Sequence, residues 1–226
     1  MSRNAAPVHG NYHGYYAKRP SIRDPRLEVL PTALFAGKCV LDVGCNEGWV
    51  SCEVAQIHAA RKVVGVDIDD ALIRAAWRKR RTVWSTQGPA PSLPSDGSSS
   101  SRKRKREEDA PAVLADYFPA SCVHSVGPLP IPDSSPEIFP HNVAFRTADW
   151  VNEAIPEDAE GYDVVVAFSI TKWIHLNGGD DGLIRFFERA ASVLKPGGFL
   201  SLNRKRGRLI GKRVGWTRNF GTLQQR

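Results

Sequence analysis

Cysteine is scarce in this chain, and the few cysteines are not spaced for cross-linking or for metal binding. The 226 residues include four, none of them in a CxxC pair: Cys39, Cys45, Cys52 and Cys122. Small secreted proteins are held together by many paired cysteines, and cysteine-rich zinc sites need closely spaced ligands. The pattern argues against both classes. It predicts a protein of a reducing compartment, with no metal site.

Long hydrophobic runs and a secretory leader are also missing. No stretch approaches the ~18–20 consecutive apolar residues that a membrane-spanning helix needs. The first residues, MSRNAAPVHGNYHGYY, lack the apolar core of a signal peptide. Hydrophobic residues nevertheless make up 42% of the chain, which is enough to bury a core at this length. We therefore expect one globular domain with no membrane partner.

Positive charge is concentrated at two places. The net charge is +7, and residues 203–226 alone carry +8 with no acidic residue, so residues 1–202 carry −1. A second basic run, RKRKR at 102–106, is followed directly by acidic residues. Such runs are typical of nuclear-import signals and nucleic-acid contacts, although a solvated disordered segment gives the same pattern. We expect a nuclear location, with the cytoplasm as a second one.

Strand and helix patterns alternate along most of the chain. Apolar strand patterns occupy 38–44, 62–68, 142–149, 162–170 and 199–203, and helical patterns occupy 49–59, 69–81 and 179–194. Asp69 or Asp70 is expected to cap the second helix. Strands that alternate with helices pair in parallel through right-handed crossovers. The sequence predicts an α/β domain over 37–202, with a mainly parallel sheet and helices on both faces, between an N-terminal arm (1–36) and a basic tail (203–226).

Residues 85–141 interrupt this alternation. The segment holds ten of the sixteen prolines, eleven serines and the RKRKR run. Proline lacks the backbone N–H that helices and central strands need, and a serine-rich, charged sequence buries little apolar surface. We expect a long, mostly disordered insertion within the domain.

A glycine turn between two acidic strand ends is the strongest chemical signal. In VLDVGCNEG, Asp42 ends a predicted strand and Gly44 and Gly48 follow before a helix, while Asp67 ends the next strand in VVGVDID. Glycine lets the backbone turn sharply and approach a bound ligand. An acid at the end of the second strand can accept hydrogen bonds from both hydroxyls of an adenosine ribose. The arrangement predicts a nucleoside site at this edge of the sheet.

Two ligands and one structural role compete for this turn. A dinucleotide site uses GxGxxG, but Cys45 stands at the middle glycine. Asp42 lies two residues before the turn, where a carboxylate suits the cationic amino-acid end of S-adenosylmethionine better than a pyrophosphate. The pattern favours a methyltransferase over a dehydrogenase, with a purely structural turn as the third interpretation. LKPGG at 194–198, a predicted turn, recurs at this point in class I methyltransferases but decides nothing alone.

Several longer motifs are more specific. They are NYHGYYAKR, RLEVL, VLDVGCNEGWVS, VVGVDIDDALIRAA, NVAFRTADW and the stretch from YDVVVAFSITKWIHLN to LKPGGFL. Through these motifs, residues 11–81 and 142–202 resemble the bicoid-interacting type of RNA methyltransferase. The resemblance implies a class I, Rossmann-like methyltransferase fold with S-adenosylmethionine as cofactor. It further implies methyl transfer to a 5′-terminal phosphate of RNA, with the mono- or triphosphate RNA end and a ribonucleoprotein as partners.

The resemblance also implies which residues hold the cofactor. They are Tyr16 and Arg26 in the lead-in, Gly44, Cys45 and Asn46 in the turn, Asp67 and Ile68 after the second strand, and Asp149, Trp150 and Phe168 farther on. The turn pattern adds Asp42. Asp149 and Trp150 stand where the family has Asn and Tyr, and they keep an acceptor for the adenine amino group and an aromatic plane.

A terminal phosphate is already anionic near neutral pH, so the site must position it and balance its charge, with no strong base needed. Basic and hydroxyl side chains are expected to do so: Lys172, His175, Arg19 and Tyr15, with Lys18 in addition. Simpler roles are anchoring of the arm for Tyr15 and a backbone hydrogen bond for His175. Trp173 and Ile174 are expected to pack into the core. Lys172 is the leading candidate, because burying its ammonium without a partner would be costly.

The chain departs from the family pattern after residue 202. The family continues with a Glu-Pro-Gln-x-Trp type motif and strands that close the sheet, whereas this chain reads NRKRGRLIGKRVGWTRNFGTLQQR. We expect an incomplete C-terminal end without a further strand pair, as in a truncated or alternative product, which puts activity in question. The alternative functions are a class I methyltransferase with a protein or small-molecule substrate, and a catalytically crippled RNA-binding fragment.

Overall fold

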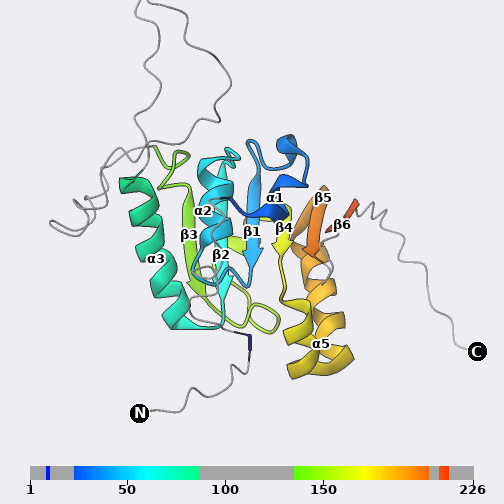
Figure 1. The fold of residues 1–226 in the computed structure, drawn as a ribbon. Coiled ribbons are helices and arrows are strands. Elements are labelled where there is room, and N and C mark those ends of the chain that lie inside the picture. Colours follow the sequence, from blue (N-terminus) through cyan, green and yellow to red (C-terminus); the bar gives the residue numbers. More distant parts are fainter. Residues whose placement is uncertain (1–8, 11–22, 87–134, 204–208, 214–226) are drawn as a thin grey trace, which may run out of the picture. The chain divides into compact units, whose positions relative to one another are not determined.

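One six-stranded sheet organises the described part of the chain. The computed structural model describes residues 9–10, 23–86, 135–203 and 209–213. The chain divides into two compact units, and the unit formed by residues 1–80 and 133–226 contains the whole sheet. The strand order is β3-β2-β1-β4-β5-β6 (Figure 1). The strands are β1 (Cys39–Val43), β2 (Lys62–Asp67), β3 (Val143–Thr147), β4 (Tyr162–Ala167), β5 (Leu194–Asn203) and β6 (Leu209–Arg213).

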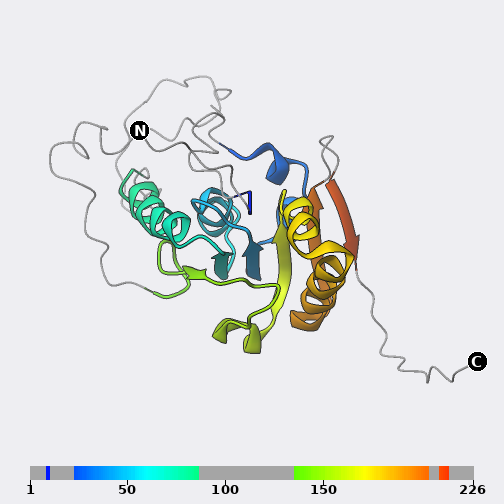
Figure 2. The same ribbon diagram turned by 90° about the horizontal axis from the view of Figure 1, so that it is seen from below.

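Helices lie on both faces of this sheet, as predicted (Figure 2). One face carries α2 (Trp49–Gln56) and α3 (Asp70–Ser85), and the other carries α5 (Thr171–Val193) and the 3-10 helix η2 (Pro156–Glu160). The short α1 (Pro25–Glu28) and η1 (Thr32–Leu34) precede β1. The Asp69 carboxylate accepts from the Ala71 amide at 2.8 Å, so Asp69, one of the two predicted residues, caps α3.

The connection pattern creates a crevice at one edge of the sheet. β1 pairs in parallel with β2 on one side and with β4 on the other. The chain passes from β1 outward through β2 and β3, then returns to β4 beside β1. Open α/β sheets bind ligands outside the carboxyl ends of the strands at such a switch point. The predicted glycine turn, directly after β1, lies there.

The core is built from the alternating faces of the central strands. Leu41, Val64 and Val165 are completely buried and point to the same face. They pack with Phe186 and Ala190 of α5 in one cluster. Burying a side chain of this size contributes about 1.5–3 kcal/mol. The sheet is therefore a rigid support for the loops at its carboxyl edge.

Three details differ from the sequence predictions. A single strand that the sequence did not predict, β6, follows β5 and pairs antiparallel with it. The turn expected at 195–198 lies within β5, where the pairing with β4 shifts its register. Most of the predicted insertion, 85–141, lies outside the described residues, but 135–141 forms turns and Phe139 is 8% exposed.

Among the described helices, none has the length and apolar character needed to cross a membrane.

Candidate functional site

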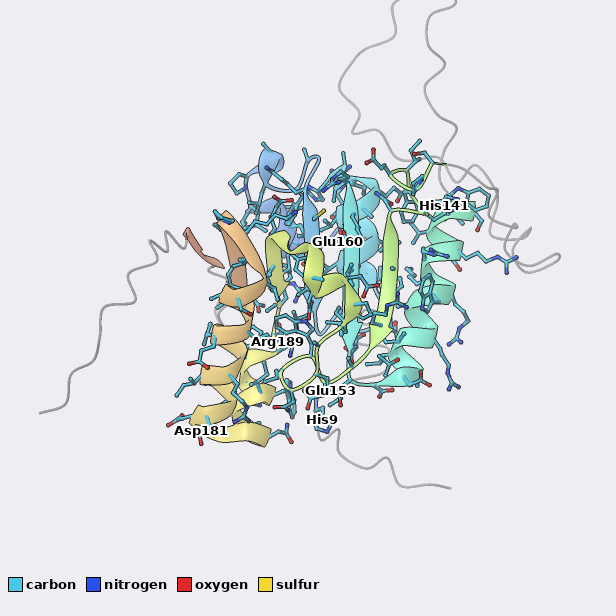
Figure 3. The ribbon with its side chains drawn as sticks, turned by 180° about the vertical axis from the view of Figure 1, so that it is seen from behind. His9, His141, Glu153, Glu160, Asp181 and Arg189 are labelled. Carbon is cyan, nitrogen blue, oxygen red and sulfur yellow. The ribbon has the colours of Figure 1, made fainter. Side chains whose placement is uncertain are left out.

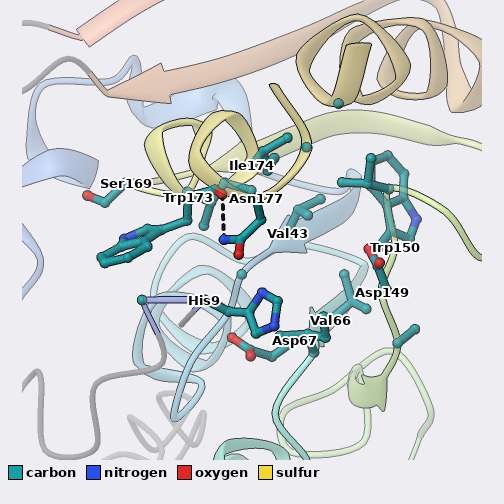
Figure 4. Close-up of a pocket in the computed structure, with 18 of the residues that line it drawn as sticks. His9, Val43, Val66, Asp67, Asp149, Trp150, Ser169, Trp173, Ile174 and Asn177 are labelled. Atoms are coloured by element: carbon teal, nitrogen blue, oxygen red, sulfur yellow. Dashed lines mark hydrogen bonds between the residues drawn. The ribbon is translucent and has the colours of Figure 1, made fainter. Parts of the chain in front are cut away.

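A pocket of about 430 Å³ lies at the carboxyl edge of the sheet, at the switch point (Figure 4). It is lined by the ends of β1 and β2 and the residues after them, by the segments after β3 and β4, by α5, and by Arg26, His9 and Gly10. Figure 3 shows His9, Glu153 and Asp181 toward this edge and His141 and Glu160 toward the opposite one. The volume is in the range of small-molecule and cofactor sites.

The bend between β1 and α2 forms one wall of this pocket. Gly44 and Gly48 have φ angles of +73° and +75°, and Asn46 has +53°. This left-handed conformation is costly for most side chains, which explains the two glycines. A Cβ at Gly44 would collide with the Cγ2 atom of Ile170 across the pocket. The bend therefore needs glycine at residue 44 for space as well as for conformation.

The amides of the bend are bonded to the neighbouring strand. Gly44 N and Cys45 N donate to the carbonyl of Val66 at 2.8 and 3.0 Å, and Asn46 N donates to Asp67 Oδ2 at 2.9 Å. A dinucleotide site presents such amides to a pyrophosphate. Because these three amides bond to β2, the bend is poorly suited to that ligand. This geometry weighs against the dehydrogenase interpretation.

Asp67 reaches the pocket from the end of β2. Its carboxylate accepts from the Asn46 amide and, through Oδ1, from the Asp69 amide at 3.0 Å. The side chain is 9% exposed, and burial raises its pKa. These two bonds fix the carboxylate, whose remaining lone pairs can accept from a ligand. Ile68 follows it, is 40% exposed and also lines the pocket.

Two predicted cofactor residues lie behind the pocket wall. Asp42 is 3% exposed, is not among the lining residues, and accepts from Ser51 Oγ of α2 at 2.6 Å. Burial raises the pKa of Asp42 to about 6. Cys45 is equally buried and also absent from the lining, and burial raises the pKa of its thiol. The structure thus brings Asp67, but not Asp42, to the pocket surface.

Arg26 is the predicted lead-in residue that the structure brings to the pocket. Its guanidinium carbon lies 4.7 Å from the centre of the Phe168 ring, and Nη1 is 3.5 Å from Ser169 Oγ. Phe168 and Ser169 line the pocket directly after β4. The guanidinium therefore faces the wall where β4 ends. Tyr16, the other predicted lead-in contact, lies outside the described residues.

Asp149 and Trp150 line the pocket at the end of the segment after β3. Asp149 Oδ2 accepts from the Asn152 side-chain amide at 2.7 Å. Trp150 is only 2% exposed, and its indole N–H donates to Asp158 at 3.2 Å. Its ring meets Phe186 of α5 edge to face, with centroids 6.2 Å apart. Trp150 therefore belongs mainly to the core and presents little of its ring to the pocket.

The predicted catalytic residues that the structure describes, Lys172 and His175, lie outside the pocket lining. Lys172 is exposed, with its ammonium 4.9 Å from the centre of the Trp173 ring. Lys172 was the leading candidate because its ammonium was expected to be buried, and that expectation is wrong. His175 Nε2 lies 2.9 Å from Asp180 Oδ1 on the same exposed surface. Neither residue lines the pocket. Tyr15, Lys18 and Arg19 lie outside the described residues.

Sequence reasoning missed several lining residues. Trp173 and Ile174, expected in the core, line the pocket, and Ile174 also packs against the core cluster. Asn177, one turn later, donates to the Trp173 carbonyl at 2.9 Å. The four-residue spacing of Trp173 and Asn177 after a strand end was a usable signal for a helix face. No local sequence pattern pointed to His9 and Gly10. The structure places Gly10 where any Cβ would overlap the Trp173 ring.

Within the described ranges, no group of three or more His, Cys, Asp or Glu side chains is arranged to hold a metal ion.

The fold and site together define a class I methyltransferase architecture: parallel strands in the order β3-β2-β1-β4-β5, a glycine bend after β1 and an acid at the end of β2. Residues 41–101 match the profile of a methyltransferase domain. Residues 162–219 match the family described as Bicoid-interacting protein 3 (Bin3). Both profile matches agree with the resemblance to bicoid-interacting-type RNA methyltransferases, which is confirmed.

Curated relatives are similar in sequence to this chain over most of its length. The 7SK snRNA methylphosphate capping enzymes of Mus musculus and Homo sapiens are 39% and 37% identical, over 86% and 91% of this chain. The U6 snRNA methylphosphate capping enzyme Amus of Drosophila melanogaster is 32% identical over 86% of it. The matches cover 30%, 31% and 52% of the relatives' own lengths. This chain therefore corresponds to a third to a half of those proteins.

Proposed function

We propose that this protein is an S-adenosylmethionine-dependent methyltransferase that acts on the 5′-terminal phosphate of RNA. The observation that carries the proposal is a pocket bounded by a glycine bend and the buried Asp67 carboxylate, in a chain with a match to the Bin3 family. The names of the mammalian and fly relatives, methylphosphate capping enzymes of small nuclear RNAs, support the RNA substrate.

The pocket residues fit the cofactor. Gly44 allows the sharp bend of the chain at the pocket wall, where Ile170 packs directly against it. Asp67, held by two backbone amides, is suited to accept from the ribose hydroxyls. Ile68 offers an apolar surface to the adenine, and Asp149 an acceptor for its amino group. When bound, S-adenosylmethionine would supply an electrophilic methyl group.

The chain's own residues then have to hold the RNA phosphate. Lys172 and His175 lie on the exposed part of the first half of α5, next to the pocket-lining Trp173 and Ile174. We propose that they balance the phosphate charge, together with Arg19 and Tyr15, which lie outside the described residues. A phosphate monoester is anionic near pH 7, so these groups would act by position and charge and not as strong bases.

Cofactor binding is tested by calorimetry with S-adenosylhomocysteine. Replacing Asp67 by alanine should weaken binding at least ~10-fold, because the ribose loses its acceptor. Asp70→Ala is the matched control, since Asp70 is an exposed acid that pairs with Arg74 and does not line the pocket. Equal affinities of wild type and Asp67→Ala would contradict the proposed site.

Substrate choice is tested with radiolabelled S-adenosylmethionine and short RNAs that end in 5′-triphosphate, 5′-monophosphate or 5′-hydroxyl. We expect label only on the phosphorylated RNAs, at the 5′ end. Label on the hydroxyl RNA, on protein or on small molecules alone would support a different methyltransferase. Salt-sensitive RNA binding without cofactor binding would support the RNA-binding fragment.

We also propose that the protein acts in the nucleus, within a ribonucleoprotein. Support comes from the small nuclear RNAs in the relatives' names and from the basic runs at 102–106 and 203–226. A fluorescent fusion should accumulate in the nucleus, and changing the basic residues of 102–106 to alanine should reduce that accumulation. Unchanged nuclear signal in the variant would remove the role of this run.

A further inference from the structure

Asp24 binds the guanidinium of Arg26 through both of its carboxylate oxygens. Arg26 Nε donates to Oδ1 at 2.8 Å, and Nη2 donates to Oδ2 at 2.5 Å. Both side chains are largely buried, with 12% exposed for Arg26 and 5% for Asp24. A two-point contact of this kind fixes the plane of the guanidinium as well as its position.

The backbone around Asp24 is held as well. Asp24 caps α1, since its Oδ1 also accepts from the Arg26 amide at 2.9 Å. The Asp24 amide in turn donates to Glu53 Oε2 at 2.8 Å. Glu53 belongs to α2, the helix that begins directly after the glycine bend. A chain of contacts thus connects α2 through Asp24 to the guanidinium at the pocket.

The consequence is that Arg26 meets the pocket with a defined orientation. With Nε and Nη2 turned to Asp24, Nη1 is the nitrogen near Ser169 Oγ at the pocket wall. The Phe168 ring supports the guanidinium face at 4.7 Å. A free arginine side chain samples many rotamers, and a ligand would otherwise have to restrict them on binding.

We propose that Asp24 is a positioning residue: it orients Arg26 so that the guanidinium can receive the carboxylate of the cofactor's amino-acid portion. The inference rests on the proposed function, and on the resemblance, which implies that Arg26 contacts that portion of the cofactor. Asp24 itself touches Arg26 and α1, and it is not among the residues that line the pocket. The proposed effect on binding is therefore indirect, by way of Arg26.

The test compares two ligands by calorimetry. S-adenosylhomocysteine carries the amino-acid portion, and 5′-methylthioadenosine has the same nucleoside and sulfur without it. Asp24→Asn keeps an oxygen for the α1 cap but loses the charge. We expect its affinity for S-adenosylhomocysteine to fall about tenfold and its affinity for 5′-methylthioadenosine to change less than about twofold. A purely structural role would weaken both ligands alike.

Further variants make the result decisive. In an Arg26→Ala background, Asp24→Asn should have no additional effect, because coupled residues are not additive. Arg26→Lys, which keeps the charge without the two-point contact, should reproduce the ligand selectivity even if Asp24→Asn unfolds. Glu160→Gln removes an exposed carboxylate paired with Lys62 and should bind both ligands normally.

The outcomes separate this inference from the proposed function. Equal weakening of both ligands, or additive effects of Asp24→Asn and Arg26→Ala, overturns the positioning role while the cofactor site stands. Wild-type protein that binds neither ligand overturns the proposed function, and the inference with it.

Discussion

At the scale of single residues, Gly44 is the position where conformation and space coincide. Its φ of +73° and the collision of an added Cβ with Ile170 both oppose any side chain. We expect Gly44→Ala to cost about 2–4 kcal/mol of unfolding free energy and to weaken S-adenosylhomocysteine binding. Chemical denaturation and calorimetry measure the two effects.

Gly37→Ala is the matched control for this substitution. Gly37 has a similar φ of +69°, but nothing lies within 4 Å of the Cβ it would gain. It should cost only about 1 kcal/mol, the part due to backbone conformation, and leave ligand binding unchanged. Equal losses for the two variants would mean that the contact with Ile170 is unimportant.

The placement of Gly44 and Asp67 at the pocket was predictable from sequence, because it depends on the local chain: a turn after one strand and an acid at the end of the next. In the sequence, Asp42 also ends a strand, as Asp67 does. Side chains alternate along a strand, however, and Asp42 points to the face covered by α2, where Ser51 donates a hydrogen bond to it. That partner comes from tertiary packing, which a strand pattern does not specify. The exposure of Lys172 likewise depends on where α5 begins, which is at Thr171 and not at residue 179, where the predicted helix starts.

At the scale of elements, the segment that contains η2 depends on Asp158. Its carboxylate accepts from the Trp150 indole, the Tyr162 hydroxyl and Arg189, at 3.2, 3.1 and 2.8 Å. Asp158→Ala should cost about 3–5 kcal/mol, because it leaves the largely buried Arg189 without its ion pair. Equilibrium denaturation in urea measures the loss.

Glu160→Ala is the control for this element, two residues farther on. Glu160 pairs with Lys62, but its side chain is 61% exposed, and exposed pairs contribute about 0–1 kcal/mol. A loss for Asp158→Ala no larger than that for Glu160→Ala would show that the carboxylate does not organise this segment.

The helix α5 shows why element boundaries were harder to predict than element types. Gly179 has φ +62° and ψ −160°, which breaks the helical conformation in the middle of α5. The periodic apolar pattern begins only after this kink, so the pattern predicted the second half alone. The first half carries the lining residues Trp173, Ile174 and Asn177. β6 was missed because five residues in a basic, glycine-containing tail give little alternation to detect.

At the scale of the whole molecule, buried acids make stability depend on pH. Burial raises the pKa of Asp42 from 3.8 to about 6. As pH rises from 3.8, the unfolded chain loses this proton first, while the folded chain keeps it until about pH 6. The folded state then binds more protons, so rising pH lowers stability across this window and has no further effect above it.

The variant Asp42→Asn isolates this contribution, since the other titrating groups are common to both proteins. The unfolding free energy of wild type minus that of the variant should fall by about 2–3 kcal/mol between pH 3.5 and 7.5. Urea denaturation at a series of pH values measures it. A difference that stays constant, or grows with pH, would mean that Asp42 is ionised in the folded protein throughout.

The hydrogen bonds of the bend have a consequence for anyone who wishes to retarget this protein to an altered cofactor analogue. Because the amides of Gly44, Cys45 and Asn46 are bonded to β2, remodelling this wall would also break the contacts between the bend and β2. The side chains that line the pocket from α5, such as Trp173, can be varied without breaking those bonds. Selectivity engineering should therefore vary α5 and leave the glycine bend untouched.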